Sequence, residues 1–170
     1  MNDANAIFYV KRNGQSYFGG SLTVGFLRVQ VSNNVPTSNP EVETGEFDTN
    51  GASKQVTVSF TYNNNSSGTG TKPNVPSQVY GTITLYRRVG GGSWSQVGNT
   101  APITGSASSD QVGGDWEASV DASGTLNTTD YDSSAGPFEY KAVVSSTGFP
   151  HSLPGSGMGY QSLTLISTEY

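Results

Sequence analysis

Few residues in this chain are of the types that carry out acid–base or nucleophilic chemistry. The single histidine, His151, lies beside Ser152 in a loop that is rich in glycine and proline. Adjacency in sequence does not make these two residues a catalytic pair, because a nucleophile and its base are assembled through space. The chain has no cysteine, which excludes disulfides, thiolate zinc sites and cysteine nucleophiles. We therefore predict a protein that is not an enzyme and that needs no cofactor.

Paired carboxylates are the other candidates for chemistry. Asp130 and Asp132, like Asp115 and Glu117, have the spacing that points two side chains to one face of a strand. Two such groups can serve as acid and base in a glycosidase. The same spacing arises wherever a strand exposes a polar face, and nothing in the sequence raises one pair above the other. We interpret both pairs as exposed polar residues.

The segment that contains Asp130 and Asp132 is also a candidate for metal binding. Residues 130–134 begin like an acidic calcium loop, but Ala135 and Lys141 stand where an EF-hand needs glycine and glutamate. A calcium site of another kind stays open as an alternative to our prediction of no metal. Zinc bound through nitrogen would need three copies of His151 on the axis of a symmetric oligomer.

The charge balance bears on the partners of the chain. A net charge of −5 and a pI near 4.6 argue against nucleic acid, because phosphate neutralisation needs clustered Lys and Arg. The adjacent pair Arg87-Arg88 is typical of a solvated strand edge or of ion-pair partners. No apolar run approaches the roughly 20 residues of a membrane span. The first residues lack the basic and apolar regions of a signal peptide, so we expect synthesis in the cytoplasm and no membrane partner.

Alternation of apolar and polar residues marks the predicted strands. In residues 138–145, Phe138, Tyr140, Ala142 and Val144 share one face, which is typical of a half-buried strand. Similar patterns predict further strands at residues 56–62, 79–89, 94–97, 115–121 and 161–168. The triple glycine at residues 90–92 is expected to turn the second of these into the third.

The segments between these strands complete the prediction. The polar residues 63–70 and the turn-rich residues 122–136 are predicted to be loops. No window has the 3.6-residue period of a helix. The expected fold class is therefore all-β, a two-sheet antiparallel β-sandwich.

The N-terminal third has a different organisation. Ile7, Phe8, Tyr9 and Val10 form a short apolar run that reads as a first strand or an arm. A longer strand with a bulge is expected at residues 22–31, and a polar connection follows it to residue 54. We predict an N-terminal region of strands and extended chain over residues 1–54, and a sandwich over residues 55–170.

The last third of the chain resembles a known family. The Asp-rich turn at 130–134, Ala135-Gly136 and the strand from Phe138 to Ser145 are followed after a loop by Ser162-Leu163-Thr164-Leu165-Ile166. This arrangement resembles the C-terminal part of the TNF/C1q-like jelly-roll domains of phage structural proteins. Residues 82–88 with their glycine turn are similar to the middle hairpin of that family, so the resemblance covers roughly residues 56 to 170.

The resemblance implies a jelly-roll-like homotrimer on a virion. It implies a bacteriophage capsid decoration (cement) protein, whose partner is the major capsid protein or another virion protein. The absence of a long coiled or repetitive stalk before the sandwich favours this role over a fibre. In such a trimer, Val143 and Ile166 together with the loop residues Phe149 and His151 are expected at the subunit interface, and the run from Ile7 to Val10 is expected to contact the capsid.

Two other functions stay open. One is a head- or tail-fibre tip that binds a receptor or a host-surface glycan, because Tyr131, Phe149 and Tyr160 are loop aromatics of the kind that bind sugars. The same rings could instead cap the sandwich or lie between subunits. The other is an immunoglobulin-like or fibronectin-III-like adhesion domain, whose strands would include residues 56–62 and 80–97.

Overall fold

All the strands lie in two antiparallel sheets. The computed structural model describes residues 8–10, 16–18, 28–34, 39–49, 53–75, 78–134, 136–147 and 160–169, and these residues contain no helix. Strands β1 (Phe8–Val10) and β2 (Ser16–Phe18) form a small sheet of their own. Since no helix is present in the described ranges, none is long and apolar enough to cross a membrane.

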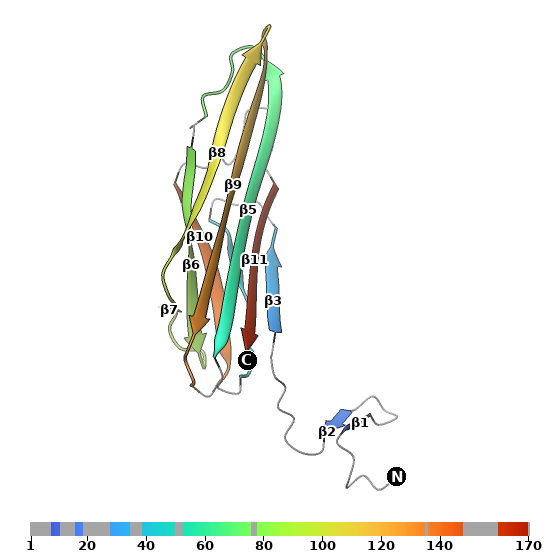
Figure 1. The fold of residues 1–170 in the computed structure, drawn as a ribbon, viewed down its shortest axis with the longest axis vertical. Helices are drawn as coiled ribbons and strands as arrows, with labels where there is room; N and C mark the ends of the chain where they lie inside the picture. The colour runs from blue at the N-terminus through green and yellow to red at the C-terminus, as the bar shows by residue number, and fades with distance from the viewer. Residues whose placement is uncertain are drawn as a thin grey trace.

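The other nine strands form one continuous sheet (Figure 1). Its order is β3-β11-β5-β9-β8-β6-β10-β4, with the short β7 beside β6. The strands are β3 (Arg28–Asn33), β4 (Glu41–Glu43), β5 (Lys54–Thr69), β6 (Gln78–Val89), β7 (Ser95–Gln96), β8 (Ala101–Val112), β9 (Asp115–Asp130), β10 (Phe138–Thr147) and β11 (Tyr160–Glu169). The all-β antiparallel fold class is confirmed, and the layers of the sandwich are formed by a single sheet that curls back on itself.

The two edges of this sheet approach each other, so the sheet is nearly closed into a barrel. The side-chain amide nitrogen of Asn33 on β3 donates to the carbonyl oxygen of Glu41, the first residue of β4, at 2.9 Å. Beyond β4 the chain continues along β10, where Phe47 and Phe138 exchange backbone hydrogen bonds of 2.8 and 2.9 Å. Strands β3 and β4 belong to the predicted region 1–54, and the sheet therefore extends across the predicted boundary at residue 54.

The interior of the barrel is made by one face of each strand. Val56, Val58, Phe60 and Tyr62 alternate inward on β5, as the sequence predicts. The apolar residues that alternate along β6, β9 and β10 are also buried: Ile83, Leu85, Trp116, Ala118, Val120, Phe138, Tyr140, Ala142 and Val144. Burial of these apolar faces is the main favourable contribution to folding.

Two strands extend well beyond the sequence prediction, and a third was not predicted. The predicted loop at 63–70 is wrong, because β5 continues to Thr69 and pairs residue by residue with β9. The predicted loop at 122–136 is wrong up to Asp130 for the same reason. Strand β8 had no predicted counterpart. These segments are polar on the outer face, and apart from Ile103 and Leu126 they carry few large apolar residues inside. They therefore lack the regular apolar alternation that marks a strand, and cross-strand pairing decides their conformation.

Glycine explains part of this missing alternation. At the end of β5, Gly68 lies opposite Trp116, and a Cβ on Gly68 would come within 2.5 Å of the indole ring. The indole nitrogen of Trp116 donates to the carbonyl oxygen of Thr69 at 3.3 Å. A large ring on β9 thus occupies the space that an inward side chain on β5 would otherwise fill. As Figure 1 shows, this end of β5, β8 and β9 reaches beyond the other strands of the sheet.

Candidate functional site

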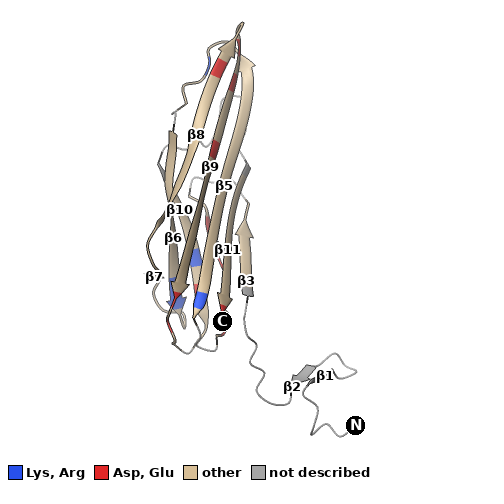
Figure 2. Cartoon of the chain, in the orientation of Figure 1, with Lys and Arg blue, Asp and Glu red and all other residues tan. Residues whose placement is uncertain are grey.

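The densest group of ionisable side chains is buried at one end of the barrel. We call it the charge cluster, and it consists of Lys54, Arg87, Asp130, Asp132, Tyr140 and Glu169. Figure 2 shows lysine and arginine gathered at this end of the nine-stranded sheet, whereas the opposite ends of β8 and β9 carry acidic residues.

Strand alternation brings these residues inside. Lys54 is in phase with Val56 and Val58 on β5, and Glu169 is in phase with Leu165 on β11. Asp130 ends β9 on its inward face. The side chain of Lys54 is 0% exposed, and Asp130 and Glu169 are each 4% exposed. Charged groups this deeply buried are normally paired and hydrogen-bonded.

Arg87 and Asp130 form the centre of the charge cluster. The Nη1 of Arg87 lies 2.6 Å from Oδ1 of Asp130, and its Nη2 lies 2.9 Å from Oδ2 of Asp132. The Tyr140 hydroxyl donates to the other oxygen of Asp130 at 2.7 Å. The backbone nitrogen of Asp132 also donates to Asp130 Oδ1, at 3.0 Å. One carboxylate therefore joins β6, β9 and β10.

Lys54 occupies the neighbouring position. Its ammonium group donates to the carbonyl oxygen of Asp132 at 2.9 Å and lies 4.1 Å from the centre of the Phe138 ring. A cation over an aromatic face is stabilised by the ring quadrupole, more so where water is excluded. In register, Lys54 pairs with Asp130 on β9 and with Glu169 on β11.

The surroundings alter the protonation of two members of the charge cluster. Burial, followed by the hydrogen bond to Asp130, raises the pKa of the Tyr140 hydroxyl well above its ordinary range. Hydrogen bonds from Ser134 lower the pKa of Asp132, and the charge of Arg87 adds to this effect. Both shifts keep Tyr140 as a neutral donor and Asp132 as an anion at neutral pH.

A second ion-pair group lies on the outer face of β4, β6 and β10. Arg88 binds the Glu139 carboxylate through two nitrogens, with Nη2 at 2.7 Å from Oε1. The ring of Trp94 lies 4.6 Å from both the Arg88 guanidinium carbon and the Lys141 ammonium. Lys141 also reaches Glu43 at 3.6 Å. The alternation of β6 thus sends Arg87 inward and Arg88 outward, and the prediction that this pair serves as ion-pair partners is confirmed.

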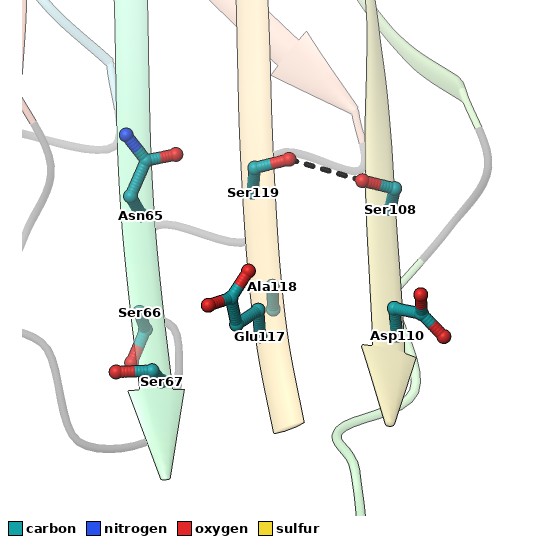
Figure 3. A pocket seen from close by; sticks show the side chains of 8 residues that line it. All are labelled: Asn65, Ser66, Ser67, Ser108, Asp110, Glu117, Ala118 and Ser119. Atoms are coloured by element: carbon teal, nitrogen blue, oxygen red, sulfur yellow. Dashed lines mark hydrogen bonds between the residues drawn. The ribbon is translucent and has the colours of Figure 1, made fainter. Parts of the chain in front are cut away.

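A hollow of about 430 Å³ lies elsewhere, on the outer face of β5, β8 and β9 (Figure 3). The hydroxyls of Ser108 and Ser119 are hydrogen-bonded there at 3.0 Å. Asp110 and Glu117 are opposite each other in register, so two like charges face this surface. Its lining consists of Asn65, Ser66, Ser67, Ser108, Asp110, Glu117, Ala118 and Ser119. The hollow offers hydrogen-bonding groups but no aromatic ring.

The predicted carboxylate pairs have different positions. The interpretation of Asp130 and Asp132 as exposed is wrong, because Asp130 is buried and both residues are bound by Arg87. Asp115 and Glu117 lie on the exposed face of β9 near its first residue. No group of three or more metal-ligating side chains occurs in the described part of the chain.

The other predicted residues are partly described. Val143 and Ile166 lie half-buried on β10 and β11, out of phase with the core residues of those strands and therefore on the outer face. Phe8, Tyr9 and Val10 form β1. Ile7, Phe149 and His151 lie outside the described residues.

Two of the three predicted loop aromatics, Tyr131 and Tyr160, lie among the described residues. Tyr131 is 79% exposed, beside the charge cluster. Tyr160 begins β11.

Sequence reasoning missed Lys54 and Glu169. Both residues continue the inward phase of an apolar alternating strand, at the point where that strand begins or ends. A charged residue in phase with a buried face is a signal that could have identified them. The Tyr140 hydroxyl carries no such signal, because tyrosine is common on half-buried strands.

Comparison of the chain with family models, with curated proteins and with solved structures finds no match.

We predict that Arg87→Met lowers the free energy of unfolding by about 3 kcal/mol, because it leaves the buried Asp130 carboxylate without its cation. Urea unfolding followed by tryptophan fluorescence measures this loss. Lys72→Met is the matched control, because Lys72 is exposed and its ammonium reaches only the Ser109 carbonyl at 3.5 Å. The control is expected to change stability by less than about 0.5 kcal/mol, and an equally small loss for Arg87→Met would contradict a central role of the charge cluster.

Stability is expected to fall in acid. The hydrogen bond from Arg88 lowers the pKa of Glu139, and hydrogen bonds from Ser134 lower that of Asp132. A carboxyl group with a depressed folded-state pKa contributes stability above its unfolded pKa of about 4, and this contribution disappears as pH falls through the folded-state value. The free energy of unfolding, measured with urea at intervals of about one pH unit from neutral pH down to a pH of about 2, should decrease below a pH of about 4.

A matched pair of variants assigns this pH dependence. Glu139→Gln removes one of the depressed carboxyls and should flatten the decline in acid. Glu41→Gln removes an exposed glutamate of the same charge and should leave the decline as in the parent protein. Equal slopes for both variants and the parent would show that Glu139 is not linked to folding.

Proposed function

We propose that this chain is a non-enzymatic structural protein of a virion, a trimeric capsid decoration protein that binds the particle through its N-terminal arm. The observation that carries the proposal is the separation of β1 and β2 from the barrel. These strands pair only with each other among the described residues, whereas β3, the next strand along the chain, lies at the edge of the nine-stranded sheet.

A sheet as small as this needs a partner to be stable. Its two strands have three residues each, with Phe8 opposite Phe18 and Tyr9 opposite Tyr17 in register. A two-stranded hairpin is at best marginally stable alone in water, and packing against another surface supplies the missing stabilisation. Cross-strand aromatic pairs suit such a role, because aromatic residues provide much of the energy of interfaces.

The chemistry of the barrel agrees with a structural role. Asp130, Asp132 and Glu139, three of its carboxylates, are engaged by Arg87 and Arg88 of β6. Their ion pairs join β6 to β10 and to the end of β9. The trimer is supported by Val143 and Ile166, two half-buried aliphatic residues on the outer face of β10 and β11.

A second candidate is a carbohydrate-binding module. Tyr131 favours it, because this ring is 79% exposed and is followed by the acidic residue Asp132. Sugars bind to exposed aromatic faces that have polar groups nearby. The resemblance to jelly-roll domains is compatible with either function, and the two candidates differ in assembly state and in ligand.

Deleting residues 1 to 20 tests the arm. The truncated chain is expected to keep the oligomeric mass and the β-rich circular dichroism spectrum of the parent protein, because the barrel strands begin at Arg28. It should no longer co-sediment with capsids of the virus whose genome encodes it. Undiminished co-sedimentation of the truncated chain would remove the arm from the proposal.

Val143→Asp tests the trimer. Light scattering coupled to gel filtration should give the mass of three chains for the parent protein and a smaller mass for the variant. The Thr84→Asp variant, which alters the register partner of Val143 on β6, tests whether the neighbouring strand shares the interface.

A monomeric parent protein would overturn the trimer. A glycan-array signal that Tyr131→Ala abolishes would favour the carbohydrate-binding module.

A further inference from the structure

Lys54 is enclosed between two carboxylates. It is the first residue of β5, and its register partners are Asp130 on β9 and Glu169 on β11. All three residues belong to the inward phase of their strands, and none is more than 4% exposed. An amine and two carboxyl groups therefore share one water-excluded end of the barrel.

The two carboxylates have different surroundings. Arg87 holds one oxygen of Asp130 at 2.6 Å, and the Tyr140 hydroxyl holds the other at 2.7 Å. These bonds engage both carboxylate oxygens of Asp130 and fix the position of its side chain. Glu169 lies on the opposite side of Lys54, in the strand that pairs with the other edge of β5.

We propose that Lys54 and Glu169 condense to form an amide cross-link between their side chains, joining β5 to β11. The Nζ of Lys54 forms a bond to Cδ of Glu169, and one C–O bond of the carboxyl group breaks. The ammonium and the carboxylate together supply the atoms of one amide and one water molecule, so charge and atoms balance without an oxidant, a metal or a cosubstrate. Two protons must pass from the Lys54 nitrogen to the departing oxygen, which leaves as water, and Asp130 carries each of them in turn.

Burial favours this reaction in two ways. Cross-strand neighbours are held at fixed separation, which converts a slow bimolecular condensation into a step with a high effective concentration. The product is neutral, so the cross-link removes two charges from a site where charge is costly. The same wall that excludes water, including the Phe138 ring 4.1 Å from Nζ, also protects the amide from hydrolysis.

The chain contains an exposed pair of the same type for comparison. Lys141 lies 3.6 Å from Glu43, whose side chain is 43% exposed. Water reaches the Glu43 side of this pair, so the ionic form is favoured and no cross-link is expected there. The inference therefore depends on burial at Lys54, and it is independent of the proposed virion function.

Intact mass measured under denaturing conditions tests the proposal on the parent protein. The purified, folded chain should be lighter than its sequence by one water molecule, after allowance for removal of Met1. Trypsin should leave residues 29–87 joined to residues 142–170, because a cross-linked Lys54 and the Lys72-Pro73 bond both resist cleavage. Fragmentation of this species should place the junction at Lys54 and Glu169.

Three variants complete the experiment. Lys54→Arg and Glu169→Ala should each have the full mass of their sequences, and Glu43→Gln should still lack one water molecule. A parent protein of full mass overturns the proposal, and this measurement needs no variant to fold. A lost water that maps to any other residue, such as a succinimide formed at an aspartate, also overturns it.

Discussion

The structure depends on the ion pair between Arg87 and Asp130. A barrel built from one sheet must exclude water from its ends as well as its sides. At the end that holds the charge cluster, charged side chains and their ion pairs fill the interior. Asp130 receives Arg87 from β6 and Tyr140 from β10 while belonging to β9 itself. Removing these charges from water is expensive, so the pair is weak evidence for stability in itself. Its value lies in register, since a shift of one residue in any of the three strands would leave a buried charge without a partner.

The same constraint separates the inside of the barrel from its outside. Adjacent arginines on β6 alternate, so Arg87 joins the interior charge cluster and Arg88 pairs with Glu139 on the outer face. Two neighbouring residues thereby fix the position of β6 against β9 on one face and against β10 on the other. Two adjacent charged residues thus position β6 on both of its faces, in a chain in which only 12% of residues are charged.

Apolar alternation predicted the strands whose residues alternate between apolar and polar. It placed the inward faces of β5 and β10 correctly, because Val56 to Tyr62 and Phe138 to Val144 each bury one face and expose the other. It failed for β8 and for the far ends of β5 and β9, where serine, threonine, asparagine and glycine dominate. There the conformation is set by long cross-strand pairing, which a local pattern does not contain. The charge cluster was missed for a related reason, since Asp130 and Lys54 are brought together by strands that are distant in sequence.

The place of β11 in the sheet has a consequence for synthesis. Among the described strands, β11 follows all the others in sequence, yet it lies between β3 and β5. Contacts between residues so far apart in sequence form slowly, because the intervening chain must first be ordered. During translation, the edges of β3 and β5 that pair with β11 therefore have no partner strand until residues 160–169 leave the ribosome. An unpaired edge of this kind is open to association with other chains until β11 has paired with it.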